Sequence, residues 1–429
     1  MTRAGTRGLT RGELRTLVLS AMGGALEFYD FIVFVFFAAV MAQLFFPPEL
    51  PEWVRQLQTF GIFAAGYLAR PIGGVIMAHF GDRAGRKRMF MLSVLLMAVP
   101  TLAIAFLPVY ASAGLWAPLL LLLLRLLQGA AVGGEVPGAW VFVSEHVPPH
   151  RVGLACGVLT GGLTLGILLG SLAATAVNSL WSSSEILAWA WRLPFVLGGA
   201  FGLLAVWLRA YLHETPVFEA MRARNALARG LPIKQVLHGH GRAIAVSMVL
   251  TWFLTAGIVV VILMTPTFAQ SAFGVAAVHA QRANSLATLM LTFGCAAYGL
   301  AADRWGAWRT IGIGAMLLAI SNLLLYAALT TLPGWFTAAY ALAGFAVGVV
   351  GVVPVLMVRL FPPAIRFSGI SFAYNIAYAI SGGLTPLLVT LWMVRDPMSP
   401  VWYVALACAA AVATTVLMTR PSRAPATAV

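Results

Sequence analysis

Five ionisable side chains lie inside long apolar stretches of this 429-residue chain: Glu27, Asp30, Arg70, Arg125 and Glu135. A charged side chain at the centre of an apolar, membrane-spanning helix costs about 2.5–3.5 kcal/mol on insertion scales. Residues of this kind usually serve a function that compensates for that cost. We therefore expect all five to face an aqueous cavity or one another.

The two acids of the first apolar stretch, Glu27 and Asp30, are suited to exchanging a proton. They are three residues apart and share one face of a helix. Two charged carboxylates that close repel each other, so one of them is expected to bind a proton near neutral pH. Asp30 is the first candidate for the exchanged proton and Glu27 the second. The alternative is a static salt bridge from either acid to Arg70 or Arg125.

The two arginines, Arg70 and Arg125, lie near the middle of their apolar stretches. Either guanidinium could bind a carboxylate through two parallel hydrogen bonds. The five charges sum to one excess negative charge. An anionic ligand would therefore enter this cluster most easily together with at least one proton.

The composition excludes most soluble classes of protein. Hydrophobic residues make up 61% of the chain, charged residues only 9%, and the mean hydropathy is +0.92. A soluble domain is about one quarter charged, so this chain could not cover its surface in water. The formal charge of +14 would suit nucleic acid, but the basic residues lie between apolar runs. The composition predicts an integral membrane protein that binds no nucleic acid.

Twelve apolar stretches are each long enough to cross a bilayer as a helix. Their expected limits are 15–46, 53–80, 88–109, 114–143, 152–178, 188–211, 242–270, 279–302, 309–331, 335–360, 367–394 and 399–419. With the N-terminus inside, 21 of the 27 Lys and Arg residues fall on the cytoplasmic side and four on the other. Because positive charges favour the cytoplasm, we expect both termini there.

The stretches divide into two halves that repeat. Residues 1–211 hold six of them, residues 212–241 form a cytoplasmic linker, and residues 242–429 hold the other six. Asp-Arg-x-Gly recurs at Asp82 and Asp303, and a Pro-Pro turn recurs at Pro148 and Pro362. The repeat predicts an all-α membrane protein of 12 helices in two pseudo-symmetric six-helix bundles. Such bundles typically rock around a central site.

These motifs resemble the major facilitator superfamily across the whole chain. The segment Gly81–Lys87 resembles its signature loop, with Ala78 in place of the usual leading glycine, and 125–129 resembles its Arg-x-x-Gln-Gly motif. The chain is most similar to the bacterial metabolite:proton symporters. That similarity rests on 27–31, 70–74, 133–135 and 214–218, whereas Val136-Pro137-Gly138 replaces the usual Trp-Gly-Gly.

The resemblance implies proton-coupled symport of a small organic acid by alternating access, with a betaine-like zwitterion or uncoupled transport as alternatives. It favours Arg125 and Glu135, with Asp30 and Glu27, for proton coupling. The candidates for substrate binding are Arg70, Tyr29, Trp252, Tyr374, Asn375 and Tyr378, although the aromatic residues could equally be packing residues. The candidates for gating are Asp82, Arg83, Arg86, Asp303, Arg304, Glu145 and Arg151. We expect Asp82 and Asp303 to cap helices of the opposite half.

A membrane-embedded enzyme is the main competing class. Six of the seven histidines are expected in loops, and no metal-ligand spacing or phosphate-binding loop occurs. We expect no enzyme activity, no metal and no cofactor. We expect a monomer in the bacterial inner membrane, with protons and a small organic anion as its partners.

Overall fold

The computed structural model describes residues 9–227 and 230–419, apart from the side chains of Glu27, Phe31, Trp53 and Ala277. The predicted cytoplasmic termini fall in 1–8 and 420–429, outside the described residues. Within the described part the regular structure is entirely helical, and twelve helical segments are long and apolar enough to cross a membrane. The predicted fold class is therefore confirmed.

Six long helices form the first half and six long segments form the second. The first half consists of α1 (Arg11–Phe36), α3 (Glu52–Ala84), α4 (Arg86–Ala105), α6 (Trp116–His146), α7 (Val152–Leu180) and α9 (Arg192–Ala210). The second half begins with α12 (Gly241–Thr255), which continues through a π-helical segment (Ala256–Met264) into α13 (Thr265–Ser271). It goes on with α14 (Ala277–Trp305) and α15 (Ala307–Thr331). The fourth segment is α16 (Phe336–Val347), which continues through a 3-10 segment (Gly348–Val352) into α17 (Val353–Leu360), and α18 (Arg366–Met393) and α19 (Ser399–Thr419) complete the half.

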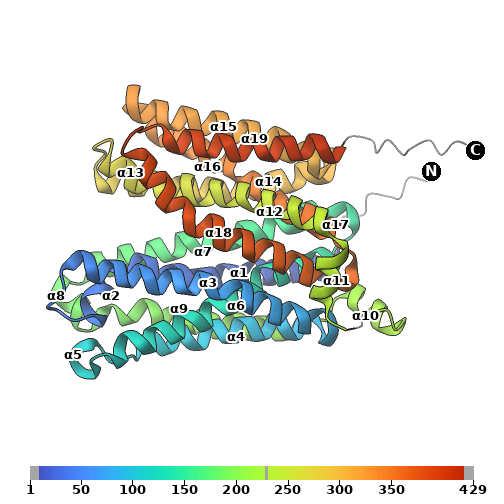
Figure 1. Ribbon diagram of the computed structural model, residues 1–429, viewed down its shortest axis with the longest axis horizontal. Coiled ribbons are helices and arrows are strands. Elements are labelled where there is room, and N and C mark those ends of the chain that lie inside the picture. The colour runs from blue at the N-terminus through green and yellow to red at the C-terminus, as the bar shows by residue number, and fades with distance from the viewer. Residues whose placement is uncertain (1–8, 228–229, 420–429) are drawn as a thin grey trace, which may run out of the picture.

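Short helices lie at both ends of the molecule. They are α2 (Ala38–Phe45), α5 (Tyr110–Ala113), α8 (Ser183–Glu185), α10 (Pro216–Ala223) and α11 (Pro232–Gly239). Figure 1 shows α10 and α11 at one end, which we call the linker end, and α2, α5, α8 and α13 at the other. The segment between the halves thus contains two surface helices.

The two halves lie side by side and meet along two main helix pairs. In Figure 1 the first half is below and the second above, with α7 and α18 between them. Helix α7 packs along α14, and α18 packs against α3 and α6. Glycines allow the first of these contacts: a Cβ added at Gly157 would overlap the carbonyl oxygen of Cys295. Small residues at such spacing let membrane helices approach closely.

Two helix limits differ from the sequence prediction. The first span ends at Phe36 and α2 starts separately, because Phe37 leaves the helical conformation (φ −104°, ψ 11°) without a glycine or proline to mark the break. The sequence predicts a loop between the second and third spans, but in the structure this loop is a single residue. Helix α3 runs through Asp82 to Ala84, and Gly85 alone separates it from α4 with φ +120°. Gly306 joins α14 to α15 in the same way, with φ +93°.

Candidate functional site

Arg70 of α3 lies where the two halves meet, beneath a group of tyrosine rings. Its guanidinium carbon is 4.3 Å from the ring centroid of Tyr378 and 5.5 Å from those of Tyr67 and Tyr374. The residue is only 2% exposed. Its Nε and Nη2 atoms have no hydrogen-bond partner among the described residues. The rings stabilise the cation through their faces, while Nε and Nη2 remain available to a ligand.

A small cavity opens between the halves next to these tyrosines. About 40 Å³ of it is open to the centres of water molecules, enough for a few waters. Its lining comes from α1, α6 and α7 of the first half and from the second half: Phe28, Val136, Trp140, Thr160, Leu163, Thr164, Ile167, Leu254, Ile258, Val350, Tyr374 and Tyr378. All of these side chains are uncharged. The cation Arg70 is not part of this lining but contacts the rings of Tyr374 and Tyr378.

The predicted substrate-binding residues of the second half separate into two places. Tyr374 and Tyr378 line the cavity, and Tyr374 meets Trp140 edge to face at 4.9 Å. Asn375 instead donates from Nδ2 to the carbonyl oxygen of Gly133 in α6 at 2.7 Å, which ties the halves together. Trp252 does not line the cavity: its indole donates to the Tyr403 hydroxyl at 2.9 Å. The predicted position of Trp252 is wrong, because its face of α12 turns toward α19.

Asp30 lies inside the first bundle rather than at the cavity. It is fully buried, and neither carboxylate oxygen has a hydrogen-bond partner in the described part of the chain. A Cβ added at Gly198 or Gly202 of α9 would lie 2.5 Å or 3.1 Å from one of these oxygens. In this conformation Asp30 does not line the cavity and forms no ion pair with Arg70 or Arg125, and its role in proton coupling stays a prediction. The glycine face of α9 accommodates the carboxyl group.

The neighbouring Tyr29 also points toward α9. Its hydroxyl donates to the carbonyl oxygen of Pro194 at 3.0 Å, and its ring packs on Phe201. Tyr29 therefore does not line the cavity in this structure, contrary to its prediction as a substrate-binding residue. The side chain of Glu27, the other predicted acid, lies outside the described residues.

Arg125 begins a chain of polar contacts through the first bundle. Its Nη1 donates to Gln128 Oε1 at 2.9 Å, and Gln128 Nε2 donates to the Thr101 hydroxyl at 2.7 Å. The Thr101 methyl group and Asp30 both face Gly198. The guanidinium also stacks on Phe34 at 4.4 Å. The Arg and Gln of the Arg-x-x-Gln-Gly motif therefore reach the surroundings of the buried Asp30.

Glu135 forms a buried ion pair with a residue that the sequence interpretation missed. Its Oε1 lies 3.8 Å from Nη2 of Arg209, at the end of α9. Arg209 is itself fully buried, donates to the carbonyl oxygen of Phe90 at 3.2 Å, and lies 3.5 Å above the Phe90 ring. The 21 Lys and Arg residues expected on the cytoplasmic side include Arg209. A buried glutamate without a predicted partner was the signal that could have identified it.

The two repeated aspartates bind helix N-termini of the opposite half. Asp82 accepts from the Ser368 backbone N–H at 2.9 Å, at the start of α18. Asp303 accepts from the backbone N–H groups of Gly153 and Leu154 at 2.6 and 2.9 Å, at the start of α7. The positive end of a helix favours a carboxylate. These are the contacts that the resemblance implies, and their role in gating stays a prediction.

A charge cluster surrounds the first of these contacts. Glu145 forms an ion pair with Arg86, and its Oε1 also lies 2.8 Å from Nη1 of Arg366. Arg86 reaches the second half through the Pro363 carbonyl oxygen at 2.7 Å, and it lies 3.7 Å from Asp82. Arg366 was missed because its sequence position, after a Pro-Pro turn, is equally typical of a solvated charge. The cluster joins both halves at the linker end.

Three predicted gating arginines take no part in this cluster. Arg83 is exposed, and its Nη1 lies 3.4 Å from His79. Arg304 is also exposed, and Arg151 is half-buried with its Nε unpartnered among the described residues. Arg151 lies close enough to Asp303 to act on its carboxylate electrostatically, and the gating role of all three arginines stays a prediction. The side chains at the ends of α3 and α14 alternate between the interface, where the aspartates lie, and solvent.

Comparison with known proteins agrees with this architecture. The sequence is 32% identical over 403 residues to a putative proline/betaine transporter of Staphylococcus aureus (strain COL), covering 91% of this chain and 84% of that protein. It is 29% identical to a citrate-proton symporter of Klebsiella pneumoniae, covering 90% and 87%. The solved structure of the proton:xylose symporter XylE superposes with a TM-score of 0.78 over 95% of both chains, at 20% identity.

The likeness to XylE supports the fold alone, because the sequences differ at four positions in five. Family assignment rests on the sequence matches. Residues 23–386 match the Major Facilitator Superfamily, a region that runs from α1 into α18 and includes both glycine-linked junctions. The resemblance noted from the motifs is thereby confirmed, and this multi-pass membrane protein belongs to the Major Facilitator Superfamily.

Proposed function

We propose that the protein is a secondary transporter that moves a small organic acid together with at least one proton by alternating access. Mono-, di- and tricarboxylates are the substrate class. The protein performs no chemical conversion and needs no metal or cofactor. The citrate-proton symporter among its relatives supports both the anionic substrate and the proton coupling.

The observation that carries this proposal is the position of Arg70. A buried guanidinium at the interface of the halves, with two nitrogen atoms unpartnered in the described structure, is poorly compensated. A carboxylate that enters from the cavity would satisfy it through charge-assisted hydrogen bonds. The tyrosines between Arg70 and the cavity would have to move aside, which couples substrate binding to the arrangement of α18.

Asp30 is the proposed proton carrier. Its burial without a hydrogen-bond partner in the described region favours the neutral, protonated carboxyl group. The Arg125–Gln128–Thr101 chain offers polar groups nearby toward which a deprotonated Asp30 could turn. Proton release would then accompany a rearrangement within the first bundle.

We further propose that the linker end faces the cytoplasm of a bacterial inner membrane, with both termini on that side and the protein acting as a monomer. The excess of Lys and Arg in segments at this end supports the orientation. With both aspartate contacts formed, the linker end is closed in this structure. Opening of the opposite end of the molecule would then admit the substrate to the cavity.

The test is transport into liposomes that contain a pH-sensitive dye, with a panel of carboxylates and betaines offered outside. For the wild type we expect one carboxylate to acidify the interior as the labelled compound enters. Asp30→Asn should abolish acidification. Arg70→Lys, which keeps the charge but loses the two-pronged geometry, should raise KM about 10- to 100-fold through loss of charge-assisted hydrogen bonds.

Arg282→Lys is the matched control, because Arg282 is exposed in α14. It should leave both the KM and the proton signal unchanged. Uptake of a carboxylate without acidification in wild type and Asp30→Asn alike would identify an uncoupled facilitator. Unchanged KM in Arg70→Lys would remove Arg70 from the substrate site.

A zwitterion of the betaine type is the second candidate, favoured by the aromatic lining of the cavity. Phe28, Trp140, Tyr374 and Tyr378 present rings to one space, and such rings bind quaternary ammonium groups. Arg70 would then hold the carboxylate of the same molecule. Trp140→Leu separates the candidates: it should weaken a betaine about 10-fold or more, and a citrate-like anion far less.

A further inference from the structure

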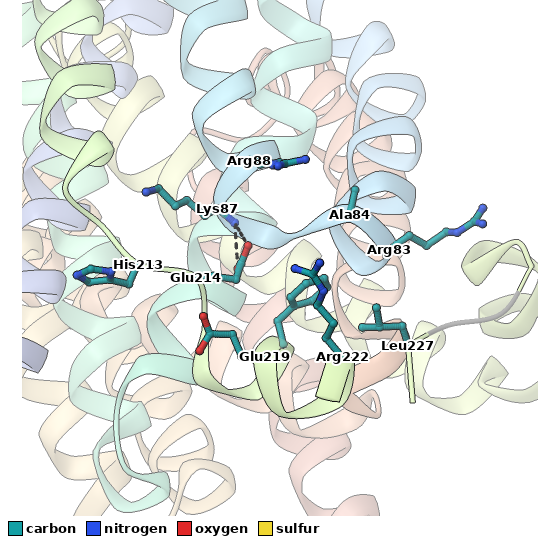
Figure 2. A pocket seen from close by; sticks show the side chains of 10 residues that line it. Arg83, Ala84, Lys87, Arg88, His213, Glu214, Glu219, Arg222 and Leu227 are labelled. Carbon is teal, nitrogen blue, oxygen red and sulfur yellow. Dashed lines mark hydrogen bonds between the residues drawn. The ribbon is translucent and has the colours of Figure 1, made fainter. Parts of the chain in front are cut away.

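A second, larger cavity lies at the linker end, outside the interface between the halves. Its volume is about 520 Å³, and it opens between the turn that joins α3 to α4 and the segment that runs from α9 into α10. In Figure 2, Arg222 rises from α10 toward that turn, and dashed lines join Glu214 to Lys87. None of the substrate or proton residues proposed above lines this space.

The cavity is rich in positive charge. Four cations line it, Arg83, Lys87, Arg88 and Arg222, against two acids. One acid, Glu214, is already bound to the backbone N–H groups of Arg86 and Lys87 at the start of α4, each at 3.2 Å. The negative charge of Glu214 is therefore directed at the positive end of α4 and does little to neutralise the arginine side chains.

Two of these cations have no partner of their own. Arg88 and Arg222 are exposed, and neither side chain makes a hydrogen bond or ion pair with any residue that the structure describes. Lys87 directs its ammonium group to the carbonyl oxygen of Ala210 at 3.1 Å. Because Arg88 lies in the first turn of α4 and Arg222 in the last turn of α10, an anion between them would connect the linker to the first bundle.

The cavity lies close to the expected level of the lipid headgroups. Trp207 and Tyr211 are both more than half exposed on the last turn of α9, with their rings edge to face at 5.1 Å. Exposed Trp and Tyr at a helix end mark the membrane–water interface. The lining residues His213 and Glu214 follow directly in the chain.

We propose that this cavity binds a phosphate group with net negative charge, held between Arg88 and Arg222. Arginine suits this ligand because its planar guanidinium donates two parallel hydrogen bonds to phosphate oxygens. Basic pockets beside membrane helices on the cytoplasmic side typically take anionic lipid headgroups. The headgroup of an anionic phospholipid and a free phosphate present the same chemistry to these two residues.

The test uses the full-length protein in neutral detergent, with phosphatidylglycerol and phosphatidylcholine added at equal concentrations and bound lipid counted by native mass spectrometry. The wild type should prefer phosphatidylglycerol. Arg88→Gln combined with Arg222→Gln should weaken that binding about 30-fold, since each basic group near a surface contributes roughly a factor of five. Arg224→Gln is the matched control: it is also exposed at the end of α10 but does not line the cavity.

A second arm identifies the source of the phosphate. Inorganic phosphate is titrated into the same samples, and its binding is followed by calorimetry and by displacement of phosphatidylglycerol. If added phosphate does not displace phosphatidylglycerol from the wild type, the lipid headgroup is the ligand. If the wild type binds phosphate and the double variant does not, the free anion is the ligand. Equal binding in wild type and the double variant, or an equal loss in Arg224→Gln, would overturn the proposal. Unfolding temperatures of the variants show that each one is folded.

Discussion

The two junctions that close the linker end share one design but differ in how much charge they bury. Each joins two long helices through one glycine, Gly85 or Gly306, and each places an aspartate on a helix N-terminus of the opposite half. Asp82 is fully buried there, whereas Asp303 is half-buried. The helix-end contact is therefore the element that both repeats keep.

The first junction adds a cluster of buried ion pairs that the second lacks in the described part of the chain. Superposing the repeats by sequence puts Ala307 where Arg86 stands and Arg359 where Glu145 stands. Among the residues that the structure describes, no ion pair like those of Glu145 with Arg86 and Arg366 occurs beside Asp303, although Arg151 and Arg359 lie near enough to act on it electrostatically. The comparison teaches that the first junction is held by several buried ion pairs, and the second by a capping carboxylate with two arginines nearby. We expect the two junctions to open with different ease.

Removing the charge at the centre of the cluster should have the largest effect. Glu145→Gln leaves two arginines without their shared carboxylate, and breaking a buried ion pair typically costs about 3–5 kcal/mol. We expect the closed linker end to be disfavoured more than 100-fold and the transport rate to fall strongly. The measurement is the rate at which a thiol reagent modifies a single cysteine at Ser371, which is buried beside α6.

Glu49→Gln is the control for this prediction, because Glu49 is exposed. Unchanged protection of the cysteine in Glu145→Gln would mean that the cluster does not hold the junction closed.

Neutralising each capping aspartate should give two unequal, intermediate effects. We expect Asp82→Asn to weaken its junction by about 2 kcal/mol, as for a buried charged hydrogen bond near a helix end, and Asp303→Asn by about 1 kcal/mol because solvent screens it. Cysteine at Ser371 reports the first junction. The native Cys295, buried against Gly157, reports the second once the other two cysteines are alanine. Equal effects would remove the proposed asymmetry.

Installing the missing charges should narrow the difference between the junctions. Ala307→Arg with Arg359→Glu places an ion pair where Arg86 and Glu145 stand in the first repeat. Because Arg359 is exposed, the gain should be at most about 1 kcal/mol, so protection of Cys295 should rise by about threefold to fivefold. Arg359→Glu alone is the control and should not protect. A double variant that protects no better than this control would show that the repeats are not equivalent here.

The smallest effect is expected for the exposed arginines next to the aspartates. Arg83→Gln and Arg304→Gln should each change transport by less than about twofold, because surface substitutions of this kind stay within about 0.5 kcal/mol. Initial rates of uptake in liposomes measure this. A tenfold loss in either variant would place that arginine in the junction after all.

The sequence predicted the number and order of the spans because length and apolar content determine them directly. It also predicted the two aspartate contacts, because the resemblance to the Major Facilitator Superfamily implies them on both sides. It could not predict which way a side chain points within a uniformly apolar helix. Asp30, Tyr29 and Trp252 were therefore expected at a cavity, whereas the structure turns them toward α9 and α19.

The ends of helices were difficult for a different reason. Arg209 and Arg366 follow apolar runs, where an arginine is equally typical of a solvated cytoplasmic charge. Only the fold brings Glu135 to one and Glu145 to the other. The π-helical segment Ala256–Met264 likewise has no sequence signal, because its composition is that of any buried helix.

The glycine links Gly85 and Gly306 also determine how the transport cycle can be observed. A single residue between two helices allows little relative movement, so α3 with α4, and α14 with α15, should each move as a rigid unit. Arg83 and Arg304 stand just before these links with exposed side chains, one on each half. Spin labels at these two positions would report the separation of the halves directly, and the change in their distance distribution on adding substrate would trace the cycle in real time.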